Sequence, residues 1–527
     1  KAGFVAGLVP AIPTKENVMA QSPDYIRLHA NDDVVIACKQ LLPGHKLEAE
    51  NLTVKEMIPP GHKIATHAIA EGEAVRRYNQ VIGFAKRAIE AGQHIHTQNL
   101  GVGGEFERDY AFCQAKKDPE PVAHPATFQG FVRANGKVGT RNYVAVIASV
   151  NCSATVVRRI AEHFNRSDIL QTQYPNIDGI VPIVHNTGCG MNGNGLDMVL
   201  LRRTIHGFAT HPNFAGVLLV GLGCELNQVG PMMDELGGPG KSTLKSLVIQ
   251  DAGGTTAAIK MGIEAVAGML PAANQAQREP VPVSKLIIGL NCGGSDGYSG
   301  ITANPALGGM VDILVAHGGT AILSETPEIY GAEHLLTCRA DTPEIGQKLV
   351  DIIDWWRDYT ARNGGEMDNN PSVGNKAGGL TTILEKSLGA VAKGGTTTLK
   401  AVYNFAEPVT AKGFVYMDTP GYDPVSATGQ AAGGAQLICF TTGRGSAFGC
   451  AGVPTIKFAT NNALWERQRD DMDVNCGDII TGEETMEQLS QRMFQAIIDY
   501  ASGKRARSEE LGYGQDEFIP WKVGAVM

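Results

Sequence analysis

Hydrophobic and polar positions follow two different patterns along this chain. From residue 130 onward, continuous apolar runs such as 143–150 and 216–220 alternate with segments of helical periodicity such as 154–164. Continuous apolar runs of this length are typical of parallel strands that helices cover on both faces. We therefore expect an α/β architecture with parallel sheets and flanking helices over most of the chain.

The same alternation continues towards the C-terminus. The predicted elements are strands at 286–290, 320–323, 437–441 and 455–458 and helices at 343–362 and 486–502. A polar segment rich in Pro and Ala, at 270–285, separates them from the earlier runs. We predict a middle α/β domain of residues 129–280 and a C-terminal domain of residues 281–527, whose polar tail from residue 503 wraps the surface.

The first hundred residues show a shorter alternation. Segments of five residues, such as 34–38 and 63–67, are broken by Pro-Gly and Glu-Gly turns, which predicts a small all-β domain over residues 19–100. Residues 101–128 have no periodicity and carry several Gly and Pro, so we expect an extended linker there. Residues 1–18 begin like the remainder of a cloning tag, and we interpret them as a cloning-derived or disordered leader.

Composition narrows the class of protein. The chain has 45 Lys and Arg against 54 Asp and Glu, a net charge of −9, so it lacks the positive charge that nucleic acid or an anionic membrane attracts. No apolar run approaches the ~20 residues that cross a bilayer. We expect a cytoplasmic protein with no nucleic-acid or membrane partner. Its 64 glycines in 527 residues exceed the usual share of ~7 %, which indicates close approach of backbone to a ligand.

Four of the ten cysteines share one sequence context. Each follows an apolar run and stands among glycines or polar residues: Cys152, Cys189, Cys224 and Cys292. Such a run would place the thiol beyond the carboxyl end of a strand, where open parallel sheets bind their ligands. Thiolates gathered at one edge suit iron or an iron–sulfur cluster. The alternative is that each cysteine is a small buried hydrophobe, and no CxxC spacing decides between the two.

Three glycine-rich loops carry groups suited to an anion. They span residues 292–305, 370–379 and 441–449, and the last two contain Lys376 and Arg444. Backbone N–H groups with a nearby cation bind a carboxylate or a phosphate. None of the loops matches a phosphate-binding fingerprint, so we favour a carboxylate or polyol ligand over a nucleotide, with ordinary turns as the alternative.

Titratable side chains add candidates for proton transfer. His29 ends a short strand, and His62 and Lys63 follow a tight Pro-Gly turn, which makes them candidates for a general base and a carboxylate anchor. The other histidines of this region are interpreted as hydrogen-bonded surface residues: His67, His94 and His96. Glu325 and Glu328 follow the strand predicted at 320–323 and could take a proton or bind a cation, although Glu328 also suits a helix N-terminus.

Eight motifs, in order along the chain, carry a resemblance to a known family. They are RLHANDD (27–33), PGHK (60–63), GKVGTRN (136–142), TGCG (187–190), GLGCE (221–225), CGGSDGYSGITANP (292–305), NPSVGNKAGG (370–379) and TTGRG (441–445). With these motifs the chain resembles the altronate/galactarate dehydratases, bacterial sugar-acid dehydratases, over nearly its whole length. Residues 325–336 are more similar to the altronate branch than to the galactarate branch.

The resemblance implies a fold and a cofactor. It implies an N-terminal β-clip (SAF-like) domain, a long linker, a middle α/β domain used in dimerisation, and a C-terminal Rossmann-like domain, so that the protein is a homodimer. It also implies iron, as Fe2+ or as a [4Fe–4S] cluster, with Mn2+ as a substitute.

The implied reaction is loss of water from a polyhydroxy acid to give a 2-keto-3-deoxy acid. Removal of the proton beside the carboxylate creates an enediolate, whose charge a metal ion stabilises. The expected metal ligands are Cys152, Cys189, Cys224 and Cys292. The expected catalytic residues are His29, His62 and Lys63. The expected substrate-binding residues are Arg141, Asn142, Ser295, Asp296, Asn304, Lys376 and Arg444.

Other functions agree with the same residues. Within the family, the substrate could be altronate or galactarate. A (2R)-sulfolactate sulfo-lyase would use the same enediolate, although that activity is usually divided between two chains. A non-enzymatic sugar-acid-binding protein would use the cysteines only for structure.

Overall fold

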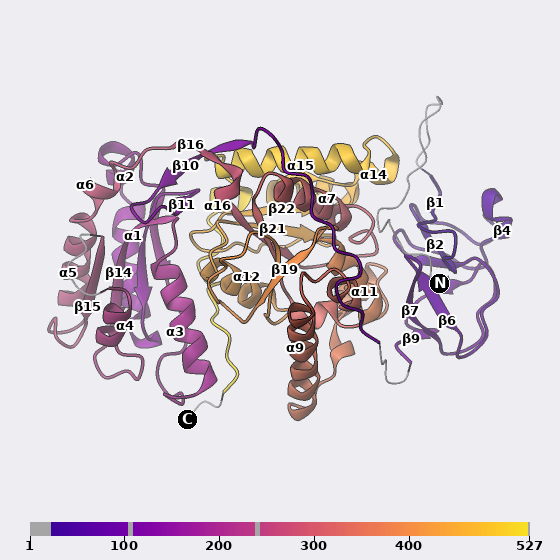
Figure 1. The fold of residues 1–527 in the computed structure, drawn as a ribbon, viewed down its shortest axis with the longest axis horizontal. Helices are drawn as coiled ribbons and strands as arrows, with labels where there is room; N and C mark the ends of the chain where they lie inside the picture. The colour runs from indigo at the N-terminus through magenta and orange to yellow at the C-terminus, as the bar shows by residue number, and fades with distance from the viewer. Residues whose placement is uncertain (1–22, 104–108, 238–242, 525–527) are drawn as a thin grey trace.

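The computed structural model describes residues 23–103, 109–237 and 243–524, and the leader expected at 1–18 lies outside this part (Figure 1). Three bodies follow one another along the long axis of the molecule, with the N-terminal domain at one end and the middle domain at the other (Figure 1). The C-terminal domain lies between them. Among the described residues, no helix is both long and apolar enough to cross a membrane.

Short antiparallel strands build the N-terminal domain, as the alternating pattern predicts. One sheet has the order β1-β2-β5-β8 and a second has the order β6-β7-β9, with a two-stranded ribbon of β3 and β4. Their bounds are β1 Tyr25–Ile26, β2 Val34–Ala37, β3 Lys46–Leu47, β4 Leu52–Thr53, β5 Lys63–Ala65, β6 Ala74–Arg77, β7 Gln80–Ala85, β8 His94–Ile95 and β9 Leu100–Gly101. Tight turns between strands this short bring their ends close together.

Four parallel strands form the sheet of the middle domain, in the order β13-β12-β14-β15. They are β12 Tyr143–Ala148, β13 Gly179–Ile183, β14 Phe214–Gly221 and β15 Leu244–Val248. Alternate residues of β12 enter two different cores, so both faces of the sheet are covered. One core includes the helices α1 (Ala154–Asn165) and α5 (Thr255–Ala267), and the other includes α3 (Leu196–Ala209).

A seven-stranded parallel sheet forms the centre of the C-terminal domain, in the order β19-β20-β18-β17-β21-β22-β23. The strands are β17 Ile287–Cys292, β18 Thr320–Leu323, β19 Leu399–Tyr403, β20 Gly413–Met417, β21 Leu437–Thr442, β22 Thr455–Ala459 and β23 Val474–Asn475. Helices α7 (Ala303–Ala316) and α15 (Met486–Ala501) pack together. Helix α12 (Asp423–Ala432) joins the two sheets, since it contacts both β17 and α3.

The contact between α3 and α12 requires a glycine. A Cβ added at Gly207 would lie 2.3 Å from the carbonyl oxygen of Ala432. The two helices can therefore approach backbone to backbone, which fixes the middle domain against the C-terminal domain.

The chain enters and leaves the middle domain side by side. The entering strand β10 (Thr127–Val132) pairs antiparallel with the leaving strand β16 (Glu279–Pro282) and with β11 (Val138–Gly139). The polar segment expected to separate two domains thus contains a strand of this small sheet.

The linker and the tail both lie on the protein surface. The described part of the linker is bound to the C-terminal domain through backbone hydrogen bonds, from the N–H of Ala115 to Cys338 (2.8 Å) and from that of Val122 to Ala316 (3.1 Å). In the tail, Phe518 packs edge-on against Phe208 of the middle domain, and Trp521 stacks on Trp356 of the helix α9 (Pro343–Arg362). The tail therefore joins the middle and C-terminal domains.

Candidate functional site

Three loops meet the N-terminal domain beyond the carboxyl ends of the C-terminal sheet. Strand β17 comes first in the chain, later strands are added on one side of it up to β20, and β21 then returns to its other side. The loops after β17 and β21 thus leave where the strand order reverses, which is the usual ligand site of an open parallel sheet. The loop at 370–379 lies with them, because Asn375 donates to the carbonyl of Ser295 (2.8 Å).

Glycines allow the N-terminal domain to approach these loops closely. The carbonyl oxygen of Gly61 would lie 2.1 Å from a Cβ on Gly297 and 2.4 Å from a Cβ on Gly379. The Tyr298 hydroxyl donates to the carbonyl of Ala37 (2.9 Å) across the same contact. The loops thus form the seam between two domains.

A buried ion-pair group fixes this seam. Lys63 donates to both oxygens of Glu385 (2.9 Å each), which lies on the helix α11 (Ile383–Ala392), and Arg77 donates to Glu385 Oε1 (2.5 Å). Burial alone would raise the pKa of Glu385, but the charges of Lys63 and Arg77 outweigh it and lower the value to about 2. Burial lowers the pKa of Lys63 to about 8. Lys63, expected to anchor a substrate, is therefore engaged in joining two domains.

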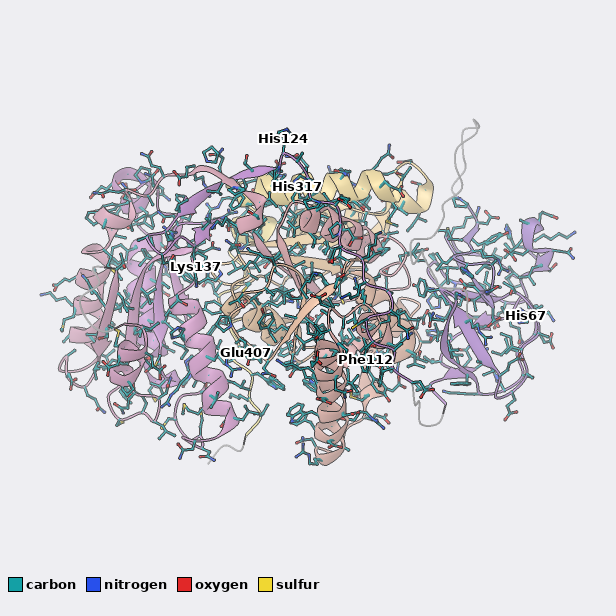
Figure 2. The ribbon with its side chains drawn as sticks, in the orientation of Figure 1. His67, Phe112, His124, Lys137, His317 and Glu407 are labelled. Atoms are coloured by element: carbon teal, nitrogen blue, oxygen red, sulfur yellow. The ribbon has the colours of Figure 1, made fainter. Side chains whose placement is uncertain are left out.

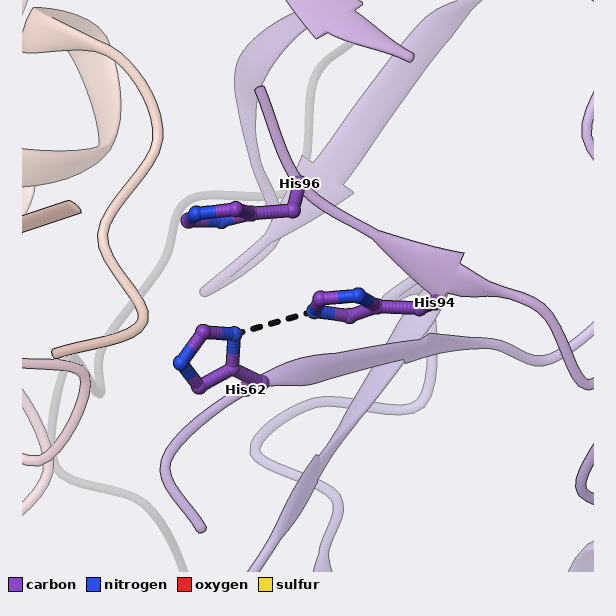
Figure 3. Close-up of side chains that lie close together, drawn as sticks. All are labelled: His62, His94 and His96. Atoms are coloured by element: carbon purple, nitrogen blue, oxygen red, sulfur yellow. Dashed lines mark hydrogen bonds between the residues drawn. The ribbon is translucent and has the colours of Figure 1, made fainter. Parts of the chain in front are cut away.

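Three imidazoles converge beside this ion pair. His62 immediately precedes β5, His94 begins β8 and His96 follows it, and their ring centroids lie 5.0 to 5.4 Å apart (Figure 3). His62 Nδ1 and His94 Nε2 are hydrogen-bonded at 2.9 Å. One ring nitrogen from each residue can be chosen so that all three lie within 4.8 Å of one another. His94 and His96, interpreted from sequence as surface residues, are therefore part of the site.

All three imidazoles are neutral at neutral pH. Burial, with the neighbouring imidazoles, lowers the pKa of His94 to about 3. Burial also lowers the pKa of His96 to about 4, with smaller contributions in the same direction from Lys63, His62 and Lys376. Neutral imidazoles can bind a metal ion or accept a proton. By contrast, the exposed His67 lies on the outer side of the same domain (Figure 2).

Two cations, Lys376 and Arg444, belong to the loops at the seam. Among the described residues, the side chains of Lys376 and Arg444 make no hydrogen bond and no ion pair. The Arg444 backbone N–H donates to Gly294 (2.8 Å), so its side chain starts beside the Gly293–Gly294 turn. The hydroxyl of Ser295 is buried and lacks a partner in the described part of the chain. These groups can therefore take a carboxylate and hydroxyl groups of a ligand.

The structure gives other partners to two expected substrate-binding residues, Asp296 and Asn304, and to the expected catalytic residue His29. Asp296 accepts hydrogen bonds from Ser299, Thr460 and Asn461, so it shapes its own loop. Asn304 donates to the carbonyl of Gly389 (2.9 Å) and accepts from the Thr441 hydroxyl (2.6 Å), and both hydrogen bonds are buried. His29 accepts from the backbone N–H of Asn31, and no described contact joins it to the three loops.

Arg141 and Asn142 lie at the opposite, amino end of the middle sheet. Arg141 is buried and donates to both oxygens of Glu509 in the tail (2.7 and 2.8 Å) and to the carbonyls of Tyr500 and Lys504. Asn142 donates to the carbonyls of Asn176 and Ala273. Both residues serve structure, so neither is available to a substrate.

Three of the four expected metal-binding thiols share one sheet edge. Cys152, Cys189 and Cys224 are exposed and follow β12, β13 and β14, which are neighbours in the middle sheet. Their loops are hydrogen-bonded, from the N–H of Asn151 to Thr187 (2.9 Å) and from that of Asn227 to Gly188 (3.1 Å). The three sulfurs do not form a set within 4.8 Å of one another, in contrast to the three imidazoles.

Cys292 lies on the other sheet, in a buried group of charges. Its sulfur is 3.0 Å from Lys393 Nζ and 3.4 Å from a Glu328 oxygen. Lys393 also donates to Glu325 (2.7 Å), and Lys386 donates to Glu328 (2.6 Å). Two ammonium groups already balance the two carboxylates around this thiol, which belongs to a different sheet from the other three cysteines.

Asp423 is a further residue of the candidate site, and its sequence context did not indicate it. It is half-buried, and a Cβ on Gly293 would lie 2.2 Å from its Oδ2, so the carboxyl group packs against the Gly293–Gly294 turn. Burial, with the charges of Glu325 and Glu328, raises the pKa of Asp423 to about 8. The group therefore carries a proton at neutral pH, which no local motif around Asp423 could have shown.

Comparison with known proteins matches most of the chain to one family. Three family models match in order: the altronate/galactarate dehydratase SAF domain at 23–102, the second domain of D-galactarate dehydratase/altronate hydrolase at 130–274, and the C-terminal domain of D-galactarate/altronate dehydratase at 283–526. The all-β N-terminal domain is thus a SAF domain.

Individual relatives agree with these models. The altronate dehydratase of Bacillus subtilis is 35 % identical, over 92 % of this chain and 96 % of its own. The galactarate dehydratase (L-threo-forming) of Escherichia coli is 38 % identical, over 91 % of this chain and 93 % of its own. The (2R)-sulfolactate sulfo-lyase of Chromohalobacter salexigens matches with two subunits, beta at 29 % identity over 73 % of this chain and alpha at 33 % over 15 %. The chain therefore belongs to the altronate and galactarate dehydratase family.

Proposed function

We propose that this protein is a hydro-lyase that removes water from a sugar acid and gives a 2-keto-3-deoxy acid. The observation that supports it best is Lys376, whose ammonium has no partner among the described residues. It stands next to Ala377, which contacts one of three neutral imidazoles, at the point where the strand order of the sheet reverses. A cation without a protein partner at such a place suits the carboxylate of the substrate. Relatives named as altronate and galactarate dehydratases support the same reaction class.

Different groups at the seam bind different parts of the substrate or shield it from water. Lys376 and Arg444 anchor the carboxylate and neighbouring hydroxyl groups, and the buried hydroxyl of Ser295 donates to one of them. The N-terminal domain covers the loops and excludes water from the charged intermediate. Because Lys63 and Arg77 fix that domain, the cover is preorganised.

Asp423 supplies the proton that the leaving hydroxyl needs. Its carboxyl group is protonated at neutral pH and packs against Gly293, next to the turn that bears Arg444. A carboxylic acid kept neutral by an apolar and anionic environment is a general acid. The charges of Glu325 and Glu328 help to keep the proton on Asp423, whereas those of Lys386 and Lys393, which pair with these two carboxylates, act in the opposite direction.

Iron is the proposed cofactor, and two donor sets of this structure suit it. The exposed thiols Cys152, Cys189 and Cys224 lie on three tied loops, and soft thiolates spread over one sheet edge suit an iron–sulfur cluster. The three imidazoles suit a single Fe2+, for which Mn2+ could substitute. Bound near the substrate, such an ion would polarise the carboxylate and stabilise the negative charge that develops.

Iron and acid-labile sulfide measured after anaerobic purification separate the two forms. Sulfide together with iron, both lost in a Cys224→Ser variant, would support the cluster. Iron without sulfide that survives Cys224→Ser would remove the thiols from the proposal.

The activity test is a panel of acids incubated with protein, Fe2+ and reductant. We expect 2-keto-3-deoxy product with altronate, because residues 325–336 resemble the altronate branch, and a lower kcat/KM with galactarate. Product from galactarate alone would reverse that order. Binding without product across the panel would favour a sugar-acid-binding protein.

A sulfo-lyase is the second candidate, because both subunits of the sulfolactate enzyme match parts of this chain. The panel therefore includes (2R)-sulfolactate, with released sulfite as the readout. Here the two parts are joined in one chain, as in the dehydratases, which favours the sugar acid. Sulfite release faster than dehydration of every sugar acid would favour the sulfo-lyase.

We further propose that the protein is a cytoplasmic homodimer with a Rossmann-like C-terminal domain. The middle domain exposes Leu196, Val199 and Leu226 beside the thiol loops, and large apolar side chains of this kind suit a subunit interface. Sedimentation of the wild type and of Val199→Lys tests the dimer, since a charge there should produce monomers.

A further inference from the structure

We propose that His62, His94 and His96 bind one divalent transition-metal ion at the seam between the N-terminal and C-terminal domains. The site rests on and deepens the proposed function, because it would place the ion beside the cations that anchor the carboxylate. Nitrogen donors of this kind suit Fe2+, Co2+ or Zn2+, and three protein ligands leave positions open for a substrate.

Two paired strands preorganise the three donors. His94 on β8 lies opposite Ile64 on β5 in an antiparallel pair, so the backbones that bear the rings are fixed relative to one another. Side chains fix the same segment: Glu56 accepts from the N–H of His94 (2.9 Å) and Asn99 from that of His96 (2.9 Å). Strand pairing and these hydrogen bonds therefore fix the backbone that brings the three rings together.

The hydrogen bonds select a tautomer of His62 that suits a metal ion. His62 Nε2 lies 3.3 Å from the carbonyl oxygen of Ala377, which accepts only from a protonated nitrogen. His62 Nδ1 then presents a lone pair to His94 Nε2 at 2.9 Å. A backbone carbonyl that accepts from the second nitrogen of an imidazole is the usual orienting partner of a metal-bound histidine.

One ring nitrogen is buried without any partner. Among the described residues, His96 Nδ1 has no hydrogen-bond partner although it is shielded from solvent. Such a group costs free energy unless something that the protein chain does not supply binds in the space around the ring. An ion at the centre of the three rings would also replace the proton shared by His62 and His94 (Figure 3).

The second compact donor set, formed by Cys292, Glu325 and Glu328, is less suited to an added metal ion. Around Cys292, Glu325 and Glu328, the ammonium groups of Lys393 and Lys386 lie 2.6 to 3.0 Å from the donor atoms and already provide the positive charge. Around the three imidazoles, Lys63 is paired with Glu385 and points its charge into the ion-pair group. Of the two compact donor sets in the described part of the chain, the imidazoles are therefore the set whose donor atoms are not bonded to an ammonium group.

Lys376 gives the site its substrate class. The next residue, Ala377, has its carbonyl oxygen 3.3 Å from His62 Nε2, so Lys376 stands on the side of the cluster that faces the C-terminal loops. A metal ion and an ammonium on the same side would bind two oxygens of one carboxylate or of a 2-hydroxy acid. The ligand class is therefore a 2-hydroxycarboxylate that bridges the two cations.

The test measures metal binding without turnover. The full chain carries Cys152→Ser, Cys189→Ser and Cys224→Ser, so that the thiols cannot compete, and is titrated with Co2+ alone after treatment with a chelator. We expect one Co2+ per chain, visible absorption of a four- or five-coordinate ion, and no thiolate charge-transfer band. His94→Gln and His96→Gln should each weaken binding by at least 100-fold, and His67→Gln, in the same domain, should leave it unchanged.

Loss of folding can be distinguished from loss of metal binding. Gln can retain a hydrogen bond, and thermal unfolding shows whether each variant is folded. Folded His94→Gln and His96→Gln variants that bind Co2+ like the wild type would overturn the proposal, as would absence of Co2+ binding to the parent. Co2+ bound at this site with no product from any acid would leave the site intact and refute the dehydratase instead. Turnover by a folded His94→Gln variant would refute the site and leave the dehydratase.

Discussion

Lys376 is a residue whose removal should affect substrate and leave the fold unchanged. Its ammonium has no partner among the described residues, whereas a charge-assisted hydrogen bond to a substrate contributes about 1.5–3 kcal/mol. We expect Lys376→Ala to raise KM by about 10- to 100-fold, since 1.36 kcal/mol corresponds to one factor of ten. Steady-state kinetics with the best acid of the panel measures this.

Lys137 provides the matched control, because it lies on the middle domain, away from the seam (Figure 2). Lys137→Ala should leave KM and the unfolding midpoint unchanged. A Lys376→Ala enzyme with normal KM and a lowered midpoint would assign the residue to stability.

Protonation of Asp423 should determine how kcat changes at high pH. With a pKa of about 8, its carboxyl group loses its proton as the pH rises through 8, so kcat should fall on the alkaline side. Asp423→Asn keeps the shape but cannot donate an acidic proton, and should lower kcat by about 10²- to 10⁴-fold. A pH profile of the wild type whose alkaline limb persists unchanged in Asp423→Asn would exclude this residue as the acid.

Short motifs identified candidate residues but not their partners. Lys376 and Arg444 could be proposed from glycine-rich loops, since a free cation is a local property. Arg141 could not be excluded, because its partner Glu509 stands 368 positions later in the chain. For the same reason, nothing in the sequence near His94 indicates that a turn at residue 61 brings His62 to it.

At the scale of elements, β5 and α11 are joined by the pair of Lys63 and Glu385. Glu385→Gln leaves two buried cations without a carboxylate, which costs about 3–5 kcal/mol in comparable buried pairs. We expect the N-terminal domain to detach in this variant, seen as a larger radius of gyration in small-angle scattering and faster proteolysis of the linker. Lys55→Met, which removes an exposed pair with Glu90 in the same domain, is the control.

The same pair predicts a response to acid. The pKa of Glu385 is lowered to about 2 in the folded protein, against 4.5 ordinarily. Its contribution to stability is therefore complete above about pH 4.5 and is lost as the pH falls towards 2. Domain attachment that weakens between pH 8 and 6 would be inconsistent with this origin.

Elements with a strong hydrophobic period were predictable, and their meeting places were not. The strand at 320–323 and the helix at 343–362 have the predicted bounds, because buried runs and long amphipathic stretches are local patterns. Helix α11 was not predicted, since its buried Glu385 and Lys386 make it look polar until their partners on other elements are known. The extended linker predicted at 101–128 likewise gave no indication of the seam whose buried ion pairs join the small domain to the C-terminal domain.

At the scale of the molecule, the covalent linker is not what joins the small domain to the large one. The buried ion pairs and the glycine contacts do so, and in the sulfolactate relative the corresponding parts are two separate subunits. We expect a protease site inserted after Gly103 to be cut without loss of activity, with both pieces eluting together in gel filtration. In the Glu385→Gln background the cut pieces should separate. Separation of the pieces in the wild type would show that the linker is needed.

The pairing of Arg141 with Glu509 also sets an order of biosynthesis. Arg141 lies just before the first strand of the middle sheet, whereas the oxygens that bind its guanidinium, apart from the carbonyl of Thr140, belong to Tyr500, Lys504 and Glu509 in the tail region. A nascent middle domain therefore lacks these partners of the Arg141 guanidinium until residues 500–509 have been translated. The contact between the middle domain and the tail can thus form only late in synthesis, and a chain truncated before Glu509 should lose the carboxylate that pairs with Arg141.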